Sequence, residues 1–477
     1  MIFQSIDYLL FFGALLSFYF WLPTRGQNGL LLVAGAVFYG WIHPWFLALN
    51  GTIAIIDWGC ARGMEGASST TRRKVFLGIS LTANLLSLAL FKYLGFFTAN
   101  VSAMLTAIGL MTEPWVLQLM LPVGLSFFTF QNIGYAVDVY RGQQPACRSL
   151  LEYATFATYF PQRLAGPIER ASRMLPQYHA KRRPSLEVVR SGIVLTLWGL
   201  FQKMVIADSA SILANMVFLI RDASFPVLWG GVIAYGVQIY ADFSGYTAIA
   251  RGCSRILGIE LCPNFNHPYI AQSPSDFWRR WHMSLSRWFK DYLYIPLGGS
   301  RGGYWRTKQN LMVVFLVSGL WHGAGWNFIL WGAFHGLLIC TWPWFARQVP
   351  LLGEAGGRAG MAFRVVFTFA IMHVGRLFFR EHDLGMIWQH LTLNPLAASA
   401  AEWRVGVGMA AEAVLYGLPL TLLFPLVDHW KWLLPADDPR LHTWRWTVFQ
   451  MLLAALLVFG ISVLRSPETG DFIYFQF

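Results

Sequence analysis

Long apolar segments separated by short polar connections recur along the whole chain. A helix needs about 20 apolar residues to cross a bilayer, and a shorter one is tolerated at membrane depth only where protein or a water-filled cavity covers its backbone. The pattern predicts an all-α, polytopic membrane protein with about eleven or twelve membrane-spanning helices, plus re-entrant helices and helices in the membrane plane, with residues 150–161 as an example of one kind or the other. The predicted segments run from about residue 8 to 22, 30 to 42, 46 to 60, 75 to 97, 116 to 140, 193 to 207, 227 to 250, 311 to 320, 328 to 344, 363 to 379, 407 to 426 and 448 to 464.

Basic residues alternate between successive connections, and this alternation orients the chain. Arg25, Arg62 and Arg141 follow odd-numbered crossings, whereas the connections at 43–50 and 98–115 contain no Lys or Arg. Cytoplasmic loops carry the excess of Lys and Arg in membrane proteins. We therefore expect a periplasmic or extracellular N-terminus and cytoplasmic basic loops. Two longer basic stretches fit the cytoplasmic side as well, at residues 162–190 and 251–310.

The composition favours a single integral-membrane domain over residues 1–477. Only 13% of the residues are charged and 56% are hydrophobic, whereas soluble domains carry about 25% charged residues. The 22 Trp, 18 Tyr and 38 Phe exclude a disordered chain. Because the basic loops account for the net charge of +12, we expect a lipid bilayer and no nucleic acid as partner. The five cysteines have neither disulfide-framework nor metal-ligand spacing, so we expect no metal site.

Residues 273–290 are predicted to form one amphipathic helix that lies flat at the cytoplasmic headgroups. Ser273 suits an N-cap and Pro274 suits the first helical position. At 100° per residue, aromatic and aliphatic side chains share one arc and mostly cationic ones the opposite arc, with His282 at the edge of the apolar arc and turned toward protein. The apolar arc holds Phe277, Trp278, Trp281, Leu285, Trp288 and Phe289, and the polar arc holds Arg279, Arg280, Ser284, Arg287 and Lys290.

Two of the eleven histidines have surroundings that are unusual for a titratable group. His322 directly follows an apolar run, and an ionisable side chain at membrane depth indicates a functional site by default. Gly319, Gly323 and Gly325 flank it and would let a substrate or another backbone approach closely. A histidine hydrogen-bonded between helices, with glycines that only serve packing, explains the same pattern equally well. For His282, a residue that ties the in-plane helix to the bundle is the simpler interpretation.

An acidic group also lies within an apolar segment. Asp242 and Ser244 belong to the segment at about 227–250, where a buried carboxylate needs a partner. We expect His322, His282 or an arginine to supply that partner.

Signatures of other enzyme classes are missing from the sequence. It contains no nucleophile elbow, Walker A loop or HExxH helix. The glycine-rich stretch 298–303 matches no nucleotide fingerprint and is interpreted as a flexible turn. The alternative is that its backbone N–H groups, with Arg301 nearby, bind the phosphates of a donor.

Several motifs, in the order in which they occur here, resemble the membrane-bound O-acyltransferase (MBOAT) family. The similarity extends over essentially the whole chain and is strongest from about residue 120 to 345. It is closest to the bacterial branch of the alginate O-acetylases and next to the teichoic acid D-alanyl transferases. The motifs lie at residues 130–142, 160–168, 242–246, 277–286, 288–299, 319–323 and 472–477.

The resemblance implies a catalytic role for His322 and places the second histidine of the family on His282. It also implies a tunnel through the membrane that joins a cytosolic donor entrance to the opposite face. His322 would act as a general base or be acylated briefly itself, and the sequence leaves both routes open. Supporting positions are Asp242, Ser244, Trp321 and Trp281, and donor-binding positions are Arg279, Arg280 and Arg301.

The activity that the resemblance implies is acetyl transfer from a cytosolic thioester, acetyl-CoA, across the bacterial inner membrane. The acetyl group would reach an exopolysaccharide through a periplasmic SGNH-type acetyltransferase within a polysaccharide-modification complex. Acetyl-CoA is then a substrate, and no bound cofactor is expected. The alginate enzymes have His-Leu where this chain has Gln162-Arg163, so the acceptor polymer stays open. A polysaccharide or lipid-linked substrate flippase and a non-catalytic scaffold are the competing functions.

Overall fold

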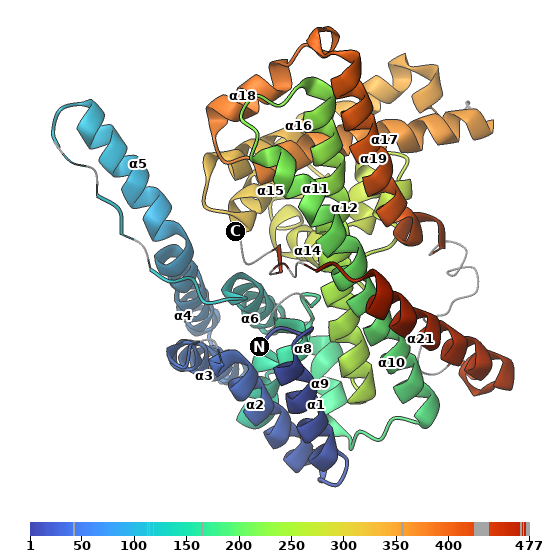
Figure 1. Ribbon diagram of the computed structural model, residues 1–477. Helices are drawn as coiled ribbons and strands as arrows, with labels where there is room; N and C mark the ends of the chain where they lie inside the picture. Colours follow the sequence, from blue (N-terminus) through green and yellow to red (C-terminus); the bar gives the residue numbers. More distant parts are fainter. Residues whose placement is uncertain are drawn as a thin grey trace. The chain divides into compact units, whose positions relative to one another are not determined.

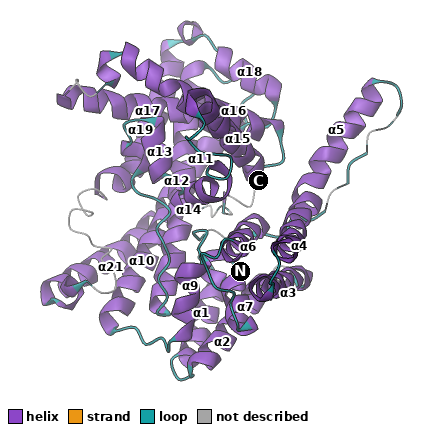
Figure 2. Cartoon of the chain, turned by 180° about the vertical axis from the view of Figure 1, so that it is seen from behind, coloured by secondary structure: helices purple, strands orange, loops and turns teal. Residues whose placement is uncertain are grey.

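The computed structural model is helical throughout its described part, which contains no strand (Figure 2). The all-α prediction is confirmed. Contacts divide the chain into two compact units, residues 1–185 with 254–262 and residues 186–253 with 263–477, and the interpretation as one membrane domain stays a prediction. The structure describes residues 1–41, 43–111, 113, 115–117, 119–163, 166–353, 357–423, 438–467, 470 and 472–473.

The first unit is built from nine helices within the described residues. α4 continues through a π-helical turn, Ala89–Tyr93, into α5, and these helices extend well beyond α3 (Figure 1). The nine are α1 (Ile6–Tyr19), α2 (Thr24–Gly40), α3 (Trp45–Gly66), α4 (Thr70–Leu88), α5 (Leu94–Ala107), α6 (Leu125–Tyr140), α7 (Leu150–Thr158), α8 (Phe160–Arg163) and α9 (Ala171–His179).

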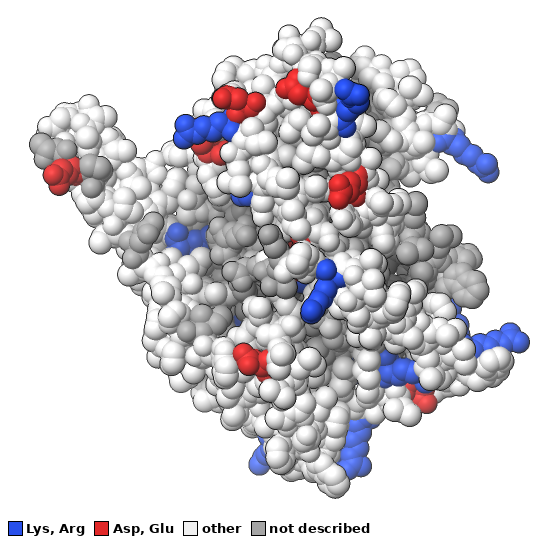
Figure 3. Space-filling model, in the orientation of Figure 1, with Lys and Arg blue, Asp and Glu red and all other residues white. Residues whose placement is uncertain are grey.

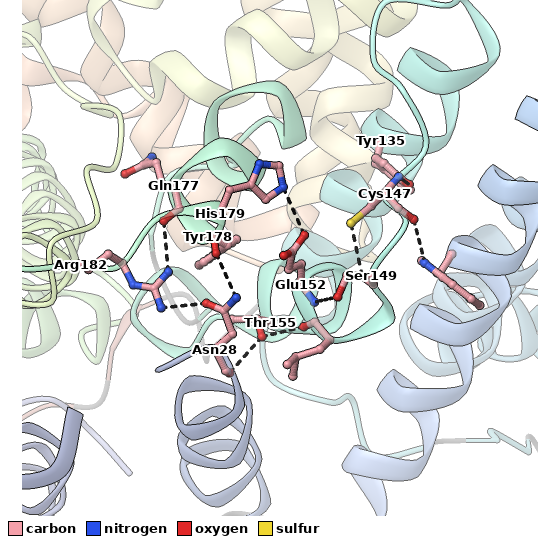
Figure 4. Close-up of polar contacts among 12 residues, drawn as sticks. Asn28, Tyr135, Cys147, Ser149, Glu152, Thr155, Gln177, Tyr178, His179 and Arg182 are labelled. Carbon is pink, nitrogen blue, oxygen red and sulfur yellow. Dashed lines mark hydrogen bonds and ion pairs between the residues drawn. The ribbon is translucent and has the colours of Figure 1, made fainter. Parts of the chain in front are cut away.

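Polar contacts hold the short helices of this unit in place (Figure 4). Asn28 of α2 is buried, and its amide donates to the carbonyl of Tyr178 at 3.0 Å. Arg182 Nη2 donates to Asn28 Oδ1 at 2.7 Å, and Thr155 Oγ1 donates to the Asn28 carbonyl at 3.2 Å. Because burial leaves such groups no water to bind, these bonds fix α2, α7 and α9 against one another.

The second unit contains the segments with candidate chemistry. Within it, α15 and α16 lie side by side (Figure 1), and α16 also packs against α17. Its helices are α10 (Leu186–Phe201), α11 (Asp208–Phe218), most of α12 (Phe225–Ile256), α13 (Pro274–Arg280), α14 (Met283–Phe289), α15 (Gly303–His322), α16 (Trp326–Gln348), α17 (Gly357–Arg380), α18 (Leu384–Thr392), α19 (Ala400–Leu418) and α21 (Trp444–Leu464).

The exposed surface is that of a multi-pass membrane protein. The face in Figure 3 carries few charged side chains on a broad uncharged surface, and Leu452 and Phe459 of α21 are 67% and 65% exposed. Burying such area in lipid removes it from water. Among the described residues, five helical stretches are long and apolar enough to span a membrane, namely Thr70–Ala107, Leu186–Phe218, Trp326–Gln348, Gly357–Arg380 and Trp444–Leu464.

The other predicted segments also coincide with helices in the described residues, with one exception. The segment predicted from about residue 116 becomes helical only at Leu125. Pro122 and the left-handed Gly124, with φ of 74°, precede α6 and prevent an earlier start. The total of eleven or twelve spans and the through-membrane tunnel stay predictions.

The single amphipathic helix predicted over residues 273–290 is wrong. Ser273 caps α13 by accepting from the N–H of Asp276, and Pro274 occupies its first turn, as predicted. The helix ends at Arg280, however, because Trp281 is extended and His282 is left-handed, with φ of 44° and ψ of 54°. α14 then starts in a new direction, and Ser284 is buried rather than on a polar face, with Oγ donating to Asn264 Oδ1 at 2.6 Å.

Candidate active site

His322 is the last residue of α15, and its side chain is buried, at 5% exposure. Aromatic rings surround the imidazole. The ring centroids of Trp331 and Phe379 lie 4.9 Å and 5.3 Å from it, both edge-on. The adjoining Trp321 lies at 5.0 Å. This setting keeps most of the imidazole away from solvent.

The glycines beside His322 bring α16 close to α15. A Cβ on Gly319 would lie 2.2 Å from the carbonyl oxygen of Phe328, and a Cβ on Gly323 would lie 2.0 Å from the Phe328 ring. Only residues without a side chain fit there. Of the two roles predicted for the glycines, the close approach of another backbone is thus observed at Gly319.

His282 reaches the same aromatic cluster from the break between α13 and α14. Its ring centroid lies 4.8 Å from Phe243 of α12 and 6.1 Å from Trp321. Trp321 therefore contacts both predicted histidines, and the fold brings them together although 39 intervening residues separate them in sequence. The side chain of His282 is 1% exposed, which agrees with the prediction that it faces protein rather than water.

A cavity of about 450 Å³ opens beside this cluster, between α13, α14 and α15. One part of its lining is cationic, with Arg279, Arg287 and Lys290, and no acidic residue lines it. The rest is largely apolar or aromatic and includes Trp278. That ring contacts Trp331 at 5.5 Å, and Trp331 contacts His322. The cavity thus matches a ligand with an anionic part and an apolar part. Two tryptophan rings, Trp278 and Trp331, connect its lining to His322.

Among the described residues, Asp242 pairs with neither a histidine nor an arginine, so that prediction is wrong. Its Oδ1 lies 3.0 Å from Nζ of Lys203, and its Oδ2 accepts from the N–H of Ile473 at 2.6 Å. Lys203 also lies 2.9 Å from Asp208, and all three of these charged side chains are 2% exposed. Paired charges are far less costly to bury than single ones. Asp242 therefore anchors the segment that contains Ile473, and a role in catalysis stays a prediction.

The described part of the C-terminal aromatic motif packs on α12, the helix that contains Asp242. Phe472 is fully buried and stacks on Tyr246 of α12, with ring centroids 4.3 Å apart. Residues 474–477 of this motif, and 164–165 of another family motif, lie outside the described residues. In the family motif at 242–246, Ser244 donates its hydroxyl to Gln202 and lines a cavity of about 50 Å³. The residue of that motif that contacts His282 is Phe243.

Comparison with known proteins identifies the family. A family model described as MBOAT, membrane-bound O-acyltransferase family, matches residues 144–379, which include both histidines. The chain is 35% identical to a protein of Azotobacter vinelandii described as probable alginate O-acetylase AlgI, over 100% of both chains. The chain belongs to the membrane-bound O-acyltransferase family.

Other members act on other polymers, as their descriptions state. The peptidoglycan O-acetyltransferase of Helicobacter pylori is 31% identical over 96% of this chain and 94% of its own. The teichoic acid D-alanyltransferase of Bacillus subtilis is 30% identical over 47% of this chain and 60% of its own. This chain is an O-acyltransferase.

Within this O-acyltransferase, the three cations predicted to bind the donor lie in different places. Arg279 lines the cavity and is 73% exposed. Arg280 is held by Asp276, with Nε 3.0 Å from Oδ1, and neither it nor the exposed Arg301 lines the cavity. The cavity instead includes Arg287 and Lys290. Both residues lie on the predicted polar arc, so the sequence identified them as cations on one helix face. The break at 281–282 instead places them in the lining of the cavity.

Trp281 makes a cation–π contact that the sequence did not indicate. Its ring lies under the guanidinium of Arg376, 4.2 Å from the ring centroid to Cζ, and it stacks on Phe277 at 5.5 Å. Arg376 belongs to α17, which is long and apolar enough to span a membrane, and was not singled out from the sequence. An arginine in an otherwise apolar span was the signal that could have found it.

Proposed function

We propose that this O-acyltransferase takes an acetyl group from cytosolic acetyl-CoA and passes it across the bacterial inner membrane for O-acetylation of a polysaccharide. A periplasmic SGNH-type acetyltransferase is the proposed partner that delivers the group to the polymer. The descriptions of the relatives from Azotobacter vinelandii and Helicobacter pylori support O-acetylation of a polymer. The alginate enzymes have His-Leu at the positions that Gln162-Arg163 occupy in this chain. The proposal therefore does not specify alginate as the acceptor polymer.

The cavity between α13, α14 and α15 carries this proposal. Coenzyme A combines phosphates with a long, largely uncharged arm that ends in the thioester. Arg279, Arg287 and Lys290 supply cations for phosphates, and the apolar lining suits the arm. The aromatic contacts from Trp278 through Trp331 then lead to His322, which is where the thioester carbonyl would react.

In the proposed reaction, His322 accepts the proton of an acceptor hydroxyl as its oxygen attacks the thioester carbonyl. The tetrahedral intermediate collapses with cleavage of the carbon–sulfur bond, and the thiolate takes the proton from the imidazolium. The products are an acetyl ester and free coenzyme A. A neutral, buried imidazole suits this role, and transient acylation of His322 itself is the alternative route. His282 would position the donor or orient His322 through Trp321, which contacts both.

The orientation of the chain is also part of the proposal. A periplasmic N-terminus places the basic stretch 251–310 in the cytoplasm, where acetyl-CoA is available. The donor cavity lies within that stretch and the following helix. A donor confined to one side and an acceptor on the other can meet only within the membrane, which is a physical reason to bury the base.

Purified full-length protein with acetyl-CoA labelled in the acetyl group tests the proposal. We expect donor-dependent release of free thiol, together with transfer of label once the partner or a soluble hydroxyl acceptor is added. Acetyl-CoA that stays intact in both cases would contradict the proposed reaction. Movement of a lipid-linked saccharide across vesicles without acyl transfer would favour the flippase instead.

The cations of the cavity should determine donor affinity. The double variant Arg287→Gln/Lys290→Gln is expected to raise KM for acetyl-CoA about 100-fold or more, because each of the two charge-assisted hydrogen bonds contributes about 1.5–3 kcal/mol. The change in kcat should be much smaller, since neither residue contacts His322. Initial rates of thiol release over a range of donor concentrations measure both constants.

Arg404→Gln is the matched control for this prediction. It removes one exposed cation from α19, outside the cavity, and KM should not change. An equal rise in KM for the control would mean that net charge, rather than the cavity, attracts the donor.

His282 should influence the reaction rate, but its own protonation should not appear in the pH–rate profile. Burial disfavours the charged imidazolium and lowers the pKa of His282 from 6.5 to about 3. The side chain therefore stays neutral throughout about pH 5–8, where an unperturbed histidine would change charge. We expect His282→Asn to reduce kcat while the acid limb of the pH–rate profile stays in place. If that limb moved in the variant, His282 would itself be the titrating group.

A further inference from the structure

A second buried polar cluster contacts the tryptophans that surround the proposed active site. It consists of Arg376 and His373 on α17 and His335 on α16, which are 5%, 2% and 2% exposed. The His335 ring lies 4.7 Å from Trp331 and 5.1 Å from Trp278. Phe379, three residues after Arg376 and therefore on the same face of α17, contacts His322.

The guanidinium of Arg376 has no carboxylate partner among the described residues. Its Cζ lies 4.2 Å from the Trp281 ring centroid and 5.7 Å from that of Phe277, and it interacts with the hydroxyl of Tyr269. Nε and Nη2 have no hydrogen-bond partner in that part of the chain, although both are buried. A buried charge without a counter-charge costs several kcal/mol.

The same unit compensates its other deeply buried cation fully. Lys203 has two carboxylates, from Asp208 and Asp242, within 3.0 Å of Nζ. At Arg376, by contrast, the described part of the chain supplies no counter-charge. A bound anion would supply it.

Nε and Nη2 of Arg376, which have no partner among the described residues, indicate which anion would fit. Nε–H and one N–H of Nη2 point the same way from one edge of the planar guanidinium, and this pair matches the two oxygens of a carboxylate. His335 Nδ1 is also buried and has no partner among the described residues. His373 Nε2 likewise has none there, but it packs against Gly236 of α12, where an added Cβ would lie 2.1 Å from it. One guanidinium balances one negative charge, so a monoanion fits better than a phosphate dianion.

We propose that Arg376, with His335 and His373, forms a buried binding site for a small carboxylate monoanion such as acetate. Arg376 binds the two carboxylate oxygens side by side, and the neighbouring imidazoles complete the polar surroundings. The site is separate from the cationic cavity, whose lining contains none of these three residues. Its existence does not require the proposed acetyl transfer.

Thermal unfolding of the purified full-length protein in detergent tests the site with sodium acetate as the probe. At constant ionic strength, replacing chloride by acetate should raise Tm with concentration up to saturation, because a ligand that binds only the folded state stabilises it. Arg376→Met should remove this acetate-specific rise, and Arg376→Lys should reduce it because an ammonium cannot form the paired contact. Any rise in sodium phosphate should be the same in Arg376→Met as in the wild type, because this salt stabilises folded proteins by exclusion from their surface.

Several outcomes would overturn the site. They are an unchanged acetate effect in Arg376→Met, a phosphate effect that Arg376→Met also removes, or no acetate effect in the wild type. Arg376→Met should fold at least as well as the wild type in chloride, because it removes an unpaired buried charge. If it does not fold, Arg376→Gln provides the same comparison. His322→Ala should keep the acetate effect, so loss of acetyl transfer and loss of this site are measured separately.

Discussion

His322→Ala is expected to lower the rate of acetyl transfer by a factor of about 10²–10⁴ while the protein stays folded. The reason is that this side chain is either the base that accepts the hydroxyl proton or the nucleophile that carries the acyl group. Both routes lose their reacting nitrogen in the variant. Thiol release and label transfer from acetyl-CoA measure the effect, and size-exclusion chromatography with thermal unfolding checks the fold.

His390→Ala is the matched control for the His322 variant. His390 is 4% exposed, close to the 5% of His322, and lies on α18 outside the aromatic cluster. Removing either ring leaves a similar cavity, but only His322 should affect the chemistry. Near wild-type transfer by a folded His322→Ala protein would reject the catalytic assignment, whatever the control does.

Lys203→Met is expected to be the most destabilising single substitution in the second unit. It leaves Asp208 and Asp242 buried without their shared cation, and breaking a buried ion pair in this way costs about 3–5 kcal/mol. Because Asp242 also holds the N–H of Ile473, the segment around Phe472 should detach from α12. A large fall in Tm and faster proteolysis near the C-terminus are the measurements.

The ion pair between Arg440 and Asp438 gives the corresponding control. The two side chains approach to 2.7 Å, as closely as the buried pairs, but that of Arg440 is 47% exposed. Arg440→Met should therefore change Tm very little. If Lys203→Met were equally mild, the buried pairs would not anchor the C-terminal segment, and Asp242 would need another explanation.

Most helices of this protein could be predicted from the sequence because their signals are local. Apolar runs of sufficient length locate α16, α17 and α21, and Ser273 followed by Pro274 marks the start of α13. The pattern failed where a single backbone conformation interrupts it. Nothing in the side-chain period shows that Trp281 is extended and His282 left-handed, because periodicity assumes the regular helix that these residues break.

Pairings between distant residues account for the rest of what was missed. Asp242 was expected to meet a histidine or an arginine, yet Lys203, 39 positions earlier, is its partner. Arg287 and Lys290 were recognised as cations on a polar face but not as the lining of a cavity. Such contacts depend on how helices pack, and no local pattern encodes which side chains then face one another.

The sequence by itself determined that this is an all-helical membrane protein of a recognisable acyltransferase family, and it singled out His322 and His282. Those conclusions rest on composition, on apolar length and on motifs that are contiguous in the chain. Only the tertiary structure decided that Trp321 contacts both histidines, that Asp242 anchors the C-terminal segment and that Arg376 is buried without a carboxylate partner in the described part of the chain. The physical reason is that burial and pairing are properties of packed helices, whereas the sequence displays one helix at a time.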